Sequence, residues 1–338
     1  MLRRLLSRPA RAPSRPCSTR ALLYYQSDRV PCSLTSTGLV GTCRDAQGSD
    51  GEFFGVDPQP AETPIASARG RPFSLDANGF CRLDDPLEHI CYYDNTAVLD
   101  SYYAHCEATV ARHTGAARVL AFDHNVRSRR RKQAAARLSG EGANAVQEPL
   151  VSYGVHNDYT LTSAARRVEQ LARPLSTNDT LRARADMPPP IVPAEVEPLL
   201  RGRWCFINVW RNVSPEPVQQ LPLALCDAAT VSNDDLVVFE IRYADRVGEN
   251  YFARRSERHR WWYFPLLTRD ECVLIKCWDS RGASFAGRLE QMRGWPPPDA
   301  ASAVPATFSL HTGFVDPLSS ADAPDRESIE VRLIAFFS

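Results

Sequence analysis

The sequence predicts a mainly β protein of the α+β class, with a double-stranded β-helix (jelly-roll) core, supporting helices and an extended N-terminal arm. From residue 203 onward, short segments rich in aromatic and β-branched residues alternate with turns, which is typical of strands. Helical spacing of apolar residues is confined to two earlier segments, 94–115 and 162–172. Many short strands after a few helices favour two packed sheets.

The N-terminal part divides by composition. Residues 1–27 contain six arginines and no acidic residue, which predicts either a basic tail or an organellar transit peptide. The expected location is therefore intracellular, either cytoplasmic or mitochondrial. Residues 28–84 are rich in Ser, Gly, Pro, Asp and Thr and predict an irregular arm. Residues 85–338 are expected to form a single jelly-roll domain, and no apolar run is long enough to predict a membrane span.

The helices are predicted from their patterns and their ends. The first covers residues 94–115 and ends at Gly115, a residue suited to a helix C-terminus. A strand at 118–122 and a basic loop at 127–142 follow. After the second helix, at 162–172, a proline-rich stretch at 174–193 predicts a linker or lid. The predicted later strands cover 204–210, 221–226, 236–243, 250–264, 272–278 and 328–337, with one more strand around His311.

Charge and cysteine content exclude several classes of function. The chain has 40 basic and 40 acidic residues, so its net charge argues against nucleic acid or a membrane surface as the partner. Ten cysteines occur without a CxxC pair, which predicts reduced thiols and not a disulfide or zinc framework. A small molecule is the expected partner, and the sequence predicts no oligomeric state.

Two residues in the stretch 155–160 suggest a metal site. His156 and Asp158 are two positions apart, so on a strand both side chains project from one face. With His311 they would supply two imidazoles and one carboxylate, the ligand set of non-haem Fe(II) oxygenases. These three are the candidate catalytic and metal-binding residues. The same donors could instead hold zinc and a water for hydrolysis.

Residues beyond His311 favour iron over zinc. Arg326 offers a fork of donors for the distal carboxylate of a dicarboxylate co-substrate, and Ser328 offers a hydroxyl on the same strand face. Arg332 lies on that face too and is a second candidate. Asn208 could hold a carboxylate of 2-oxoglutarate or be a buried amide with its own partners. His259 is expected to pack in the core or to support the site, and not to bind iron.

Eight blocks together resemble the fungal asaB hydroxylase/desaturase family, which includes a gibberellin desaturase and an aspergillic-acid hydroxylase. The blocks cover residues 115–127, 155–160, 207–211, 222–227, 259–265, 277–280, 311–314 and 326–332. The resemblance extends over about 85–337 and departs from the family pattern at Asn212, where a proline is usual, and at Glu327, where a second arginine is usual.

The resemblance implies an Fe(II)/2-oxoglutarate-dependent dioxygenase that hydroxylates or desaturates a small, secondary metabolite using O₂. A cephalosporin-methoxylase component is related to this family, so a non-catalytic partner protein of such a complex is an alternative. The presence of His156, Asp158, His311 and Arg326 together argues against lost activity, because a scaffold needs none of them.

Overall fold

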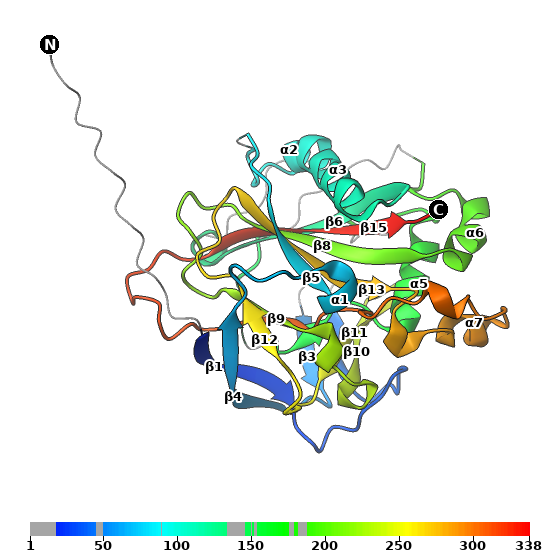
Figure 1. The fold of residues 1–338 in the computed structure, drawn as a ribbon, viewed down its shortest axis with the longest axis horizontal. Coiled ribbons are helices and arrows are strands. Elements are labelled where there is room, and N and C mark those ends of the chain that lie inside the picture. Colours follow the sequence, from blue (N-terminus) through cyan, green and yellow to red (C-terminus); the bar gives the residue numbers. More distant parts are fainter. Residues whose placement is uncertain are drawn as a thin grey trace, which may run out of the picture.

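Two β-sheets packed face to face form the core of the protein (Figure 1). The computed structural model describes residues 18–44, 50–88, 90–133, 146–149, 151, 154–175, 179–181 and 188–338. Within these residues the larger sheet contains, in spatial order, β1 (Ser18–Gln26), β4 (Pro58–Ser67), β12 (Trp261–Tyr263), β9 (Leu223–Cys226), β14 (His311–Gly313), β7 (His156–Asn157), β11 (Val247–Ala253), β10 (Leu236–Arg242), β2 (Gly41–Arg44) and β3 (Asp50–Phe54).

The smaller sheet is the more deeply buried one. In the described residues it contains β5 (Phe80–Asp84), β13 (Glu271–Asp279), β8 (Trp204–Asn212), β15 (Glu327–Phe336) and β6 (Arg118–Ser128), all paired antiparallel. Every residue of β8 and β13 is buried. The helical segment above this sheet covers one face, and the larger sheet lies against the other (Figure 1). Burial on both faces explains why six of the nine residues in each of β8 and β13 are apolar.

The two predicted helices are confirmed. The first consists of α2 (Asn95–Ala97), a π-helical turn η1 (Val98–Tyr102) and α3 (Tyr103–Thr114), and ends at Gly115 with a φ of 72°. The second is α5 (Leu161–Gln170), which begins with a capping box between Thr160 and Ser163. The shorter helices are α1 (Leu75–Asn78), α4 (Arg129–Gln133), η3 (Pro193–Glu195), α6 (Val196–Arg201), η4 (Ala228–Thr230), η5 (Asn233–Asp235), η6 (Ala283–Phe285), α7 (Arg288–Arg293) and η7 (Ala300–Ser302).

The N-terminal part differs from the expected basic tail and irregular arm. Residues 1–17 lie outside the described residues, but Ser18–Gln26 form β1, which pairs with β4 along its whole length. Residues 28–84 contribute β2 to β5 and α1. Alternate residues of β1, namely Ala21, Leu23 and Tyr25, face the core. Some of the turn-forming residues that suggested an irregular arm lie between strands, but Pro58, Pro60 and Pro64 lie within β4, where pairing with β1 and β12 supplies the order.

Smaller differences concern segment ends. The strand predicted at 118–122 continues to Ser128 and passes into α4, so the described part of the expected basic loop is structured; 134–145 lie outside the described residues. The strand predicted at 250–264 is two strands, β11 and β12, in the same sheet. The nine cysteines in the described residues are free thiols, six of them buried, as predicted. Among the described residues, no helix has both the length and the apolar character needed to cross a membrane.

Candidate metal centre

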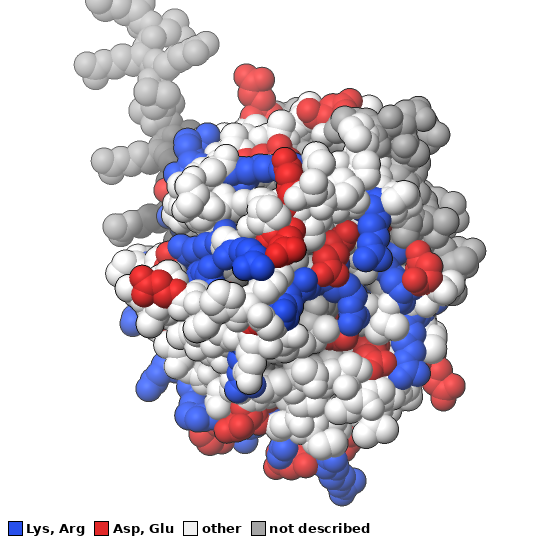
Figure 2. All heavy atoms as spheres, turned by 90° about the vertical axis from the view of Figure 1, so that its right-hand side faces the viewer, with Lys and Arg blue, Asp and Glu red and all other residues white. Residues whose placement is uncertain are grey.

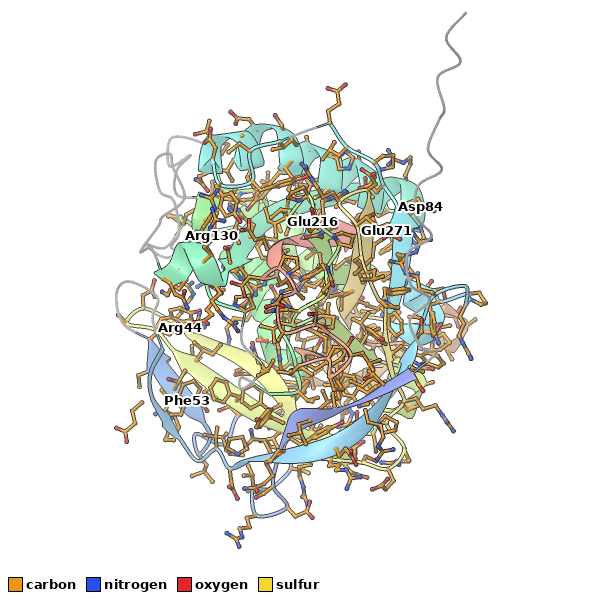
Figure 3. All side chains as sticks on the ribbon, turned by 90° about the vertical axis from the view of Figure 1, so that its left-hand side faces the viewer. Arg44, Phe53, Asp84, Arg130, Glu216 and Glu271 are labelled. Atoms are coloured by element: carbon orange, nitrogen blue, oxygen red, sulfur yellow. The ribbon has the colours of Figure 1, made fainter. Side chains whose placement is uncertain are left out.

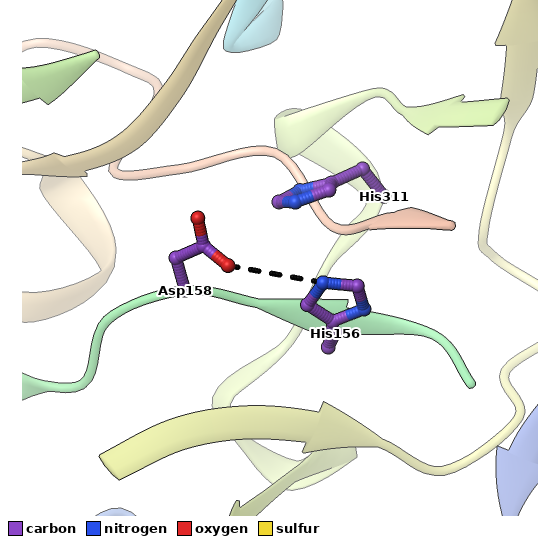
Figure 4. Close-up of side chains that lie close together, drawn as sticks. All are labelled: His156, Asp158 and His311. Carbon is purple, nitrogen blue, oxygen red and sulfur yellow. Dashed lines mark ion pairs between the residues drawn. The ribbon is translucent and has the colours of Figure 1, made fainter. Parts of the chain in front are cut away.

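Three short strands in the middle of the larger sheet bring the predicted ligands together. β7 lies between β14 and β11, and His156 pairs directly with His311. The two imidazole rings lie 4.6 Å apart, and the Nε2 atom of His156 is 3.8 Å from Asp158 Oδ1. Donor atoms of His156, Asp158 and His311 all lie within 4.8 Å of one another, facing a common point (Figure 4). The donor set and spacing fit one divalent metal ion.

The backbone orients both imidazoles. The Nδ1 atom of His156 lies 2.9 Å from the carbonyl of Gly154, and that of His311 lies 3.1 Å from the carbonyl of Ser309. Donation from Nδ1–H to these carbonyls leaves the Nε2 lone pair of each ring for a metal. Burial, and then the neighbouring His311, lower the pKa of His156 to about 3, so this ring is neutral at physiological pH.

The carboxylate of Asp158 is held at its outer oxygen. Asn208 donates to Oδ2 from Nδ2 at 2.7 Å, and Arg332 donates to the same oxygen from Nε at 3.3 Å. Oδ1 is the oxygen directed toward His156. Burial opposes ionisation of Asp158, but Arg332 and the two histidines outweigh it and hold its pKa well below the usual range. Asp158 is therefore a charged, one-oxygen donor in this arrangement.

Arg332 and Asn208 do not have the surroundings expected of co-substrate anchors. The guanidinium of Arg332 contacts three carboxylates: Asp158, Asp123 at 2.8 Å and Glu330 at 3.4 Å. The pairing of β15 with β6 is irregular between Arg332 and Leu333, next to this contact. Asn208 faces Asp158 from β8, opposite Arg332 in the ladder. Both side chains contact the candidate ligand Asp158.

Arg326 is buried beside the same cavity and has donors to spare. Its side chain is 6% exposed, and its guanidinium lies 5.7 Å from the ring centre of Trp210. Nη1 donates to the carbonyl of Leu221, a residue with an unusual φ of 48°. Nε has no hydrogen-bond partner among the described residues. Burial, and then Arg127, lower the pKa of Arg326 to about 9, still above physiological pH. A buried cation with an unused donor suits a carboxylate ligand.

Ser328 lies near the start of β15 and has less access to the cavity than Arg326. It is 1% exposed, and it is not among the residues that line the cavity next to the metal ligands. The sequence pattern predicts that Ser328 lies beside Arg326 on one face of a strand. In the structure β15 begins one residue after Arg326, at Glu327.

One cavity of about 590 Å³ contains all the candidate donors apart from Ser328 and Asn208. Its walls come from both sheets and from α5, and they include Trp210, Leu223, Tyr159 and Ile241. Tyr159, which follows Asp158 in the sequence, also lines this cavity and stacks on Phe206 with 4.1 Å between the ring centres. The metal donors therefore open onto a space large enough for a small molecule.

Sequence reasoning missed the polar face of β6. Asp123, Asn125 and Arg127 alternate along this strand and line the cavity. Asp123 accepts from Arg332, and Thr180 donates to it. The signal was present, because polar residues at every second position on a strand mark one solvated face. It was hidden because the strand was predicted to end at residue 122.

Two other histidines, His259 and His124, do not line the cavity. His259 faces Asp235 at 3.2 Å and stacks on Tyr25, which confirms that it packs in the core. His124 is fully buried, and its Nδ1 lies 3.0 Å from the hydroxyl of Tyr103.

Comparison with known proteins agrees with this geometry. The family model described as "Oxidoreductase/YMDC permease-like domain" matches residues 42–336. The chain belongs to this family. An uncharacterized protein encoded in the dcmA 3' region of Methylophilus leisingeri is 33% identical over 194 residues, which are 56% of this chain and 88% of that protein.

Two fungal relatives have names that state an activity. The Fe(II)/2-oxoglutarate-dependent dioxygenase nvfI of Aspergillus novofumigatus is 28% identical over 312 residues, 86% of this chain and 93% of its own. The hydroxylase/desaturase asaB of Aspergillus flavus is 31% identical over 156 residues, 42% of this chain and 60% of its own. The resemblance to the asaB group is thus confirmed.

A solved structure confirms the architecture. The iron and alpha-ketoglutarate-dependent endoperoxidase NvfI superposes with a TM-score of 0.68 at 22% identity, covering 95% of this chain and 99% of that chain. At this identity the likeness shows that the fold is shared: a mainly β protein with the jelly-roll arrangement of that oxygenase.

Proposed function

We propose that this protein is an Fe(II)/2-oxoglutarate-dependent oxygenase that hydroxylates or desaturates a small, secondary metabolite. The observation that carries the proposal is that three metal donors and a buried arginine with an unused donor open onto one cavity. The fungal relatives named as dioxygenases and hydroxylase/desaturases support the same assignment.

Each residue then has a distinct role. His156 and His311 would hold iron through Nε2, and Asp158 through Oδ1. Bound Fe(II), together with 2-oxoglutarate and O₂, would supply the oxidising power for attack on a C–H bond. Arg326 would bind the distal carboxylate of 2-oxoglutarate, and Trp210 would shield that contact from water.

Arg332 and Asn208 would act on the metal ligand and not on the co-substrate. By occupying Oδ2 of Asp158, they leave a single oxygen for the metal. A carboxylate restricted to one oxygen keeps positions at the metal open for 2-oxoglutarate and O₂. Ser328 is retained only as a weaker candidate for the co-substrate subsite.

Succinate formation tests the proposal. Purified protein is incubated with 2-oxoglutarate, O₂ and a metabolite extract, with Fe(II) or with Zn(II). We expect succinate only with Fe(II), and none from an Asp158→Ala variant. Zinc-dependent hydrolysis of an extract component without succinate would favour the zinc hydrolase, and no turnover with either metal would favour the non-catalytic partner.

The cellular compartment is a separate prediction. The arginine-rich, acid-free residues 1–27 predict a cytoplasmic or mitochondrial protein. Since β1 begins at Ser18, removal of a leader has to leave residues from Ser18 onward to keep this strand. Detection of intact Met1 by mass spectrometry in protein from the source cells would exclude an imported, cleaved form.

A further inference from the structure

We infer that Thr180 is a positioning residue of the metal site, which orients the candidate ligand Asp158 through Asp123 and Arg332. This role rests on the proposed function and goes beyond it, because Thr180 belongs to the segment 179–181, which supplies neither a metal donor nor the co-substrate anchor. The contact of this segment with β6 then contributes to the affinity of the site for its metal.

Three successive contacts join Thr180 to the ligand. The hydroxyl of Thr180 donates to Oδ1 of Asp123, and Oδ2 of the same carboxylate accepts from Nη1 of Arg332 at 2.8 Å. Nε of Arg332 donates in turn to Oδ2 of Asp158 at 3.3 Å. Each contact uses a different atom of the shared side chain, so all three form together as one hydrogen-bonded network.

The two middle members of this network face the cavity. The side chains of Arg332 and Asp123 are 22% and 24% exposed, and both residues line the cavity. Thr180 is 1% exposed and is not a lining residue. The N–H of His124 donates to Asp123 Oδ1 as well, at 2.9 Å, but it belongs to the same strand as Asp123. The Thr180 hydroxyl therefore ties the Asp123 carboxylate to a buried part of the chain outside β6.

The orientation of the Arg332 guanidinium determines its contact with Asp158. The group contacts three carboxylates, and the distance to Asp123, 2.8 Å, is shorter than those to Asp158, 3.3 Å, and Glu330, 3.4 Å. Because a guanidinium is planar and rigid, a shift of Asp123 turns the whole group. Asp158 then loses one of the donors that orient its outer oxygen.

The segment 179–181 joins α5 to β6 at the cavity wall. Asp179 pairs with Arg167 of α5 at 2.8 Å, and both line the cavity. Acidic and basic side chains lie next to one another on the face in Figure 2, which is the side of α6 and α7 in Figure 1, so such an ion pair alone does not mark a site. The Thr180 hydroxyl is distinctive because its partner, Asp123, contacts the residue that orients a metal ligand.

Mn(II) affinity in Thr180 variants tests this role. Full-length wild type, Thr180→Val and Thr180→Ser are titrated with Mn(II) under anaerobic conditions. Valine has the shape of threonine without the hydroxyl, so Thr180→Val should bind Mn(II) roughly 3- to 10-fold more weakly, a smaller effect than removal of a direct partner of the ligand. Thr180→Ser keeps the hydroxyl and should stay within about twofold of wild type.

Thr19→Val is the matched control. Thr19 is also buried and donates from its hydroxyl to an aspartate, Asp316, at 3.2 Å, but neither residue lines the cavity. The strand that carries Thr19, β1, crosses the lower part of Figure 3, well below Arg130 in α4, the helix that follows β6. Thr19→Val should therefore leave the Mn(II) affinity unchanged, although it removes the same kind of contact.

A double-variant cycle tests the route through Arg332. Arg332→Ala already breaks the connection between Asp123 and Asp158, so adding Thr180→Val to this variant should cause no further loss of Mn(II) affinity. At saturating Mn(II), the affinity of Thr180→Val for 2-oxoglutarate should stay within about twofold of wild type, because Arg326 is not part of these contacts.

Three results would overturn the positioning role: Mn(II) binding by Thr180→Val as tight as that of wild type, a loss of the same size in the Arg332→Ala background, or a parallel loss of 2-oxoglutarate affinity. The last of these would mean general damage to the cavity. Wild-type protein that binds no Mn(II) would instead sink the proposed function. The two failures are distinguishable, because the variants are compared only with a wild type that binds the metal.

Discussion

Replacement of Arg326 by alanine is the sharpest test of the co-substrate subsite. The guanidinium is buried, its Nε has no partner among the described residues, and Trp210 covers one side. A carboxylate bound there would be held by a charge-assisted contact shielded from water. Loss of such a contact costs about 2–5 kcal/mol, so the KM for 2-oxoglutarate should rise roughly 30- to 3,000-fold.

The measurement needs two readouts, succinate formation against 2-oxoglutarate concentration and Mn(II) affinity by titration. In Arg326→Ala only the first should change, because Arg326 touches no metal donor. Arg326→Lys should recover part of the loss, since an ammonium group supplies the charge without the fork.

Arg332→Ala is the matched comparison, and it should behave in the opposite way. Its bonds to Asp158 and Asp123 predict a loss of metal affinity of about 10- to 100-fold. If Arg332→Ala raised the KM for 2-oxoglutarate while Mn(II) affinity and the Arg326→Ala kinetics stayed normal, the anchor assignment would be wrong. No change in either variant would remove the basis for 2-oxoglutarate as co-substrate.

Four further outcomes follow from the structure. Alanine at His156, Asp158 or His311 should abolish Mn(II) binding in calorimetry and leave the circular dichroism spectrum unchanged; retained binding in Asp158→Ala would point to other ligands. Asp85→Ala removes the carboxylate that pairs with the buried guanidinium of Arg211, and it should lower the free energy of unfolding in urea by about 3–5 kcal/mol. A loss below about 1 kcal/mol would contradict this. Burial opposes ionisation of Glu271, but Arg69, the Thr268 backbone and Arg82 hold its pKa at about 2; the carboxylate therefore stabilises the fold above the unfolded pKa of about 4.5 and loses this effect as pH falls toward 2, so Glu271→Gln should lower Tm at pH 7 more than at pH 3. Deletion of residues 1–26 removes β1 and should lower Tm relative to deletion of residues 1–17, with equal values arguing against a structural role for this strand.

The sequence predicted the metal donors well because their geometry is local. The spacing of His156 and Asp158 predicts a shared face on a strand, and their side chains do converge although β7 ends at Asn157. His311 followed from its position in a strand-rich region and from the resemblance. The N-terminal strands were missed, since β1 and β4 depend on pairing with each other across more than thirty intervening positions. Local composition reports the turns between such strands and not their partners.

The choice between Arg326 and Arg332 could not be made from periodicity. Both lie at even spacing along one strand, so the pattern gives them the same face. The two arginines differ in their neighbours. Arg332 pairs in the sheets with Asp123 of β6 and Asn208 of β8, and its guanidinium contacts both Asp123 and Asp158. Those neighbours become known only when the order of the strands is known.

The orientation of each ligand by protein atoms has a practical consequence for metal content. Hydrogen bonds with Gly154, Ser309, Asn208 and Arg332 orient the imidazoles and the carboxylate. Chelators should therefore strip the metal without unfolding the chain, in contrast to sites that assemble only around their ion. Affinity of such donors for divalent ions follows a general chemical order that does not favour iron. The ion recovered with the purified protein will then reflect what the growth medium and the buffers supplied, and activity after deliberate reloading is the property that identifies the working metal.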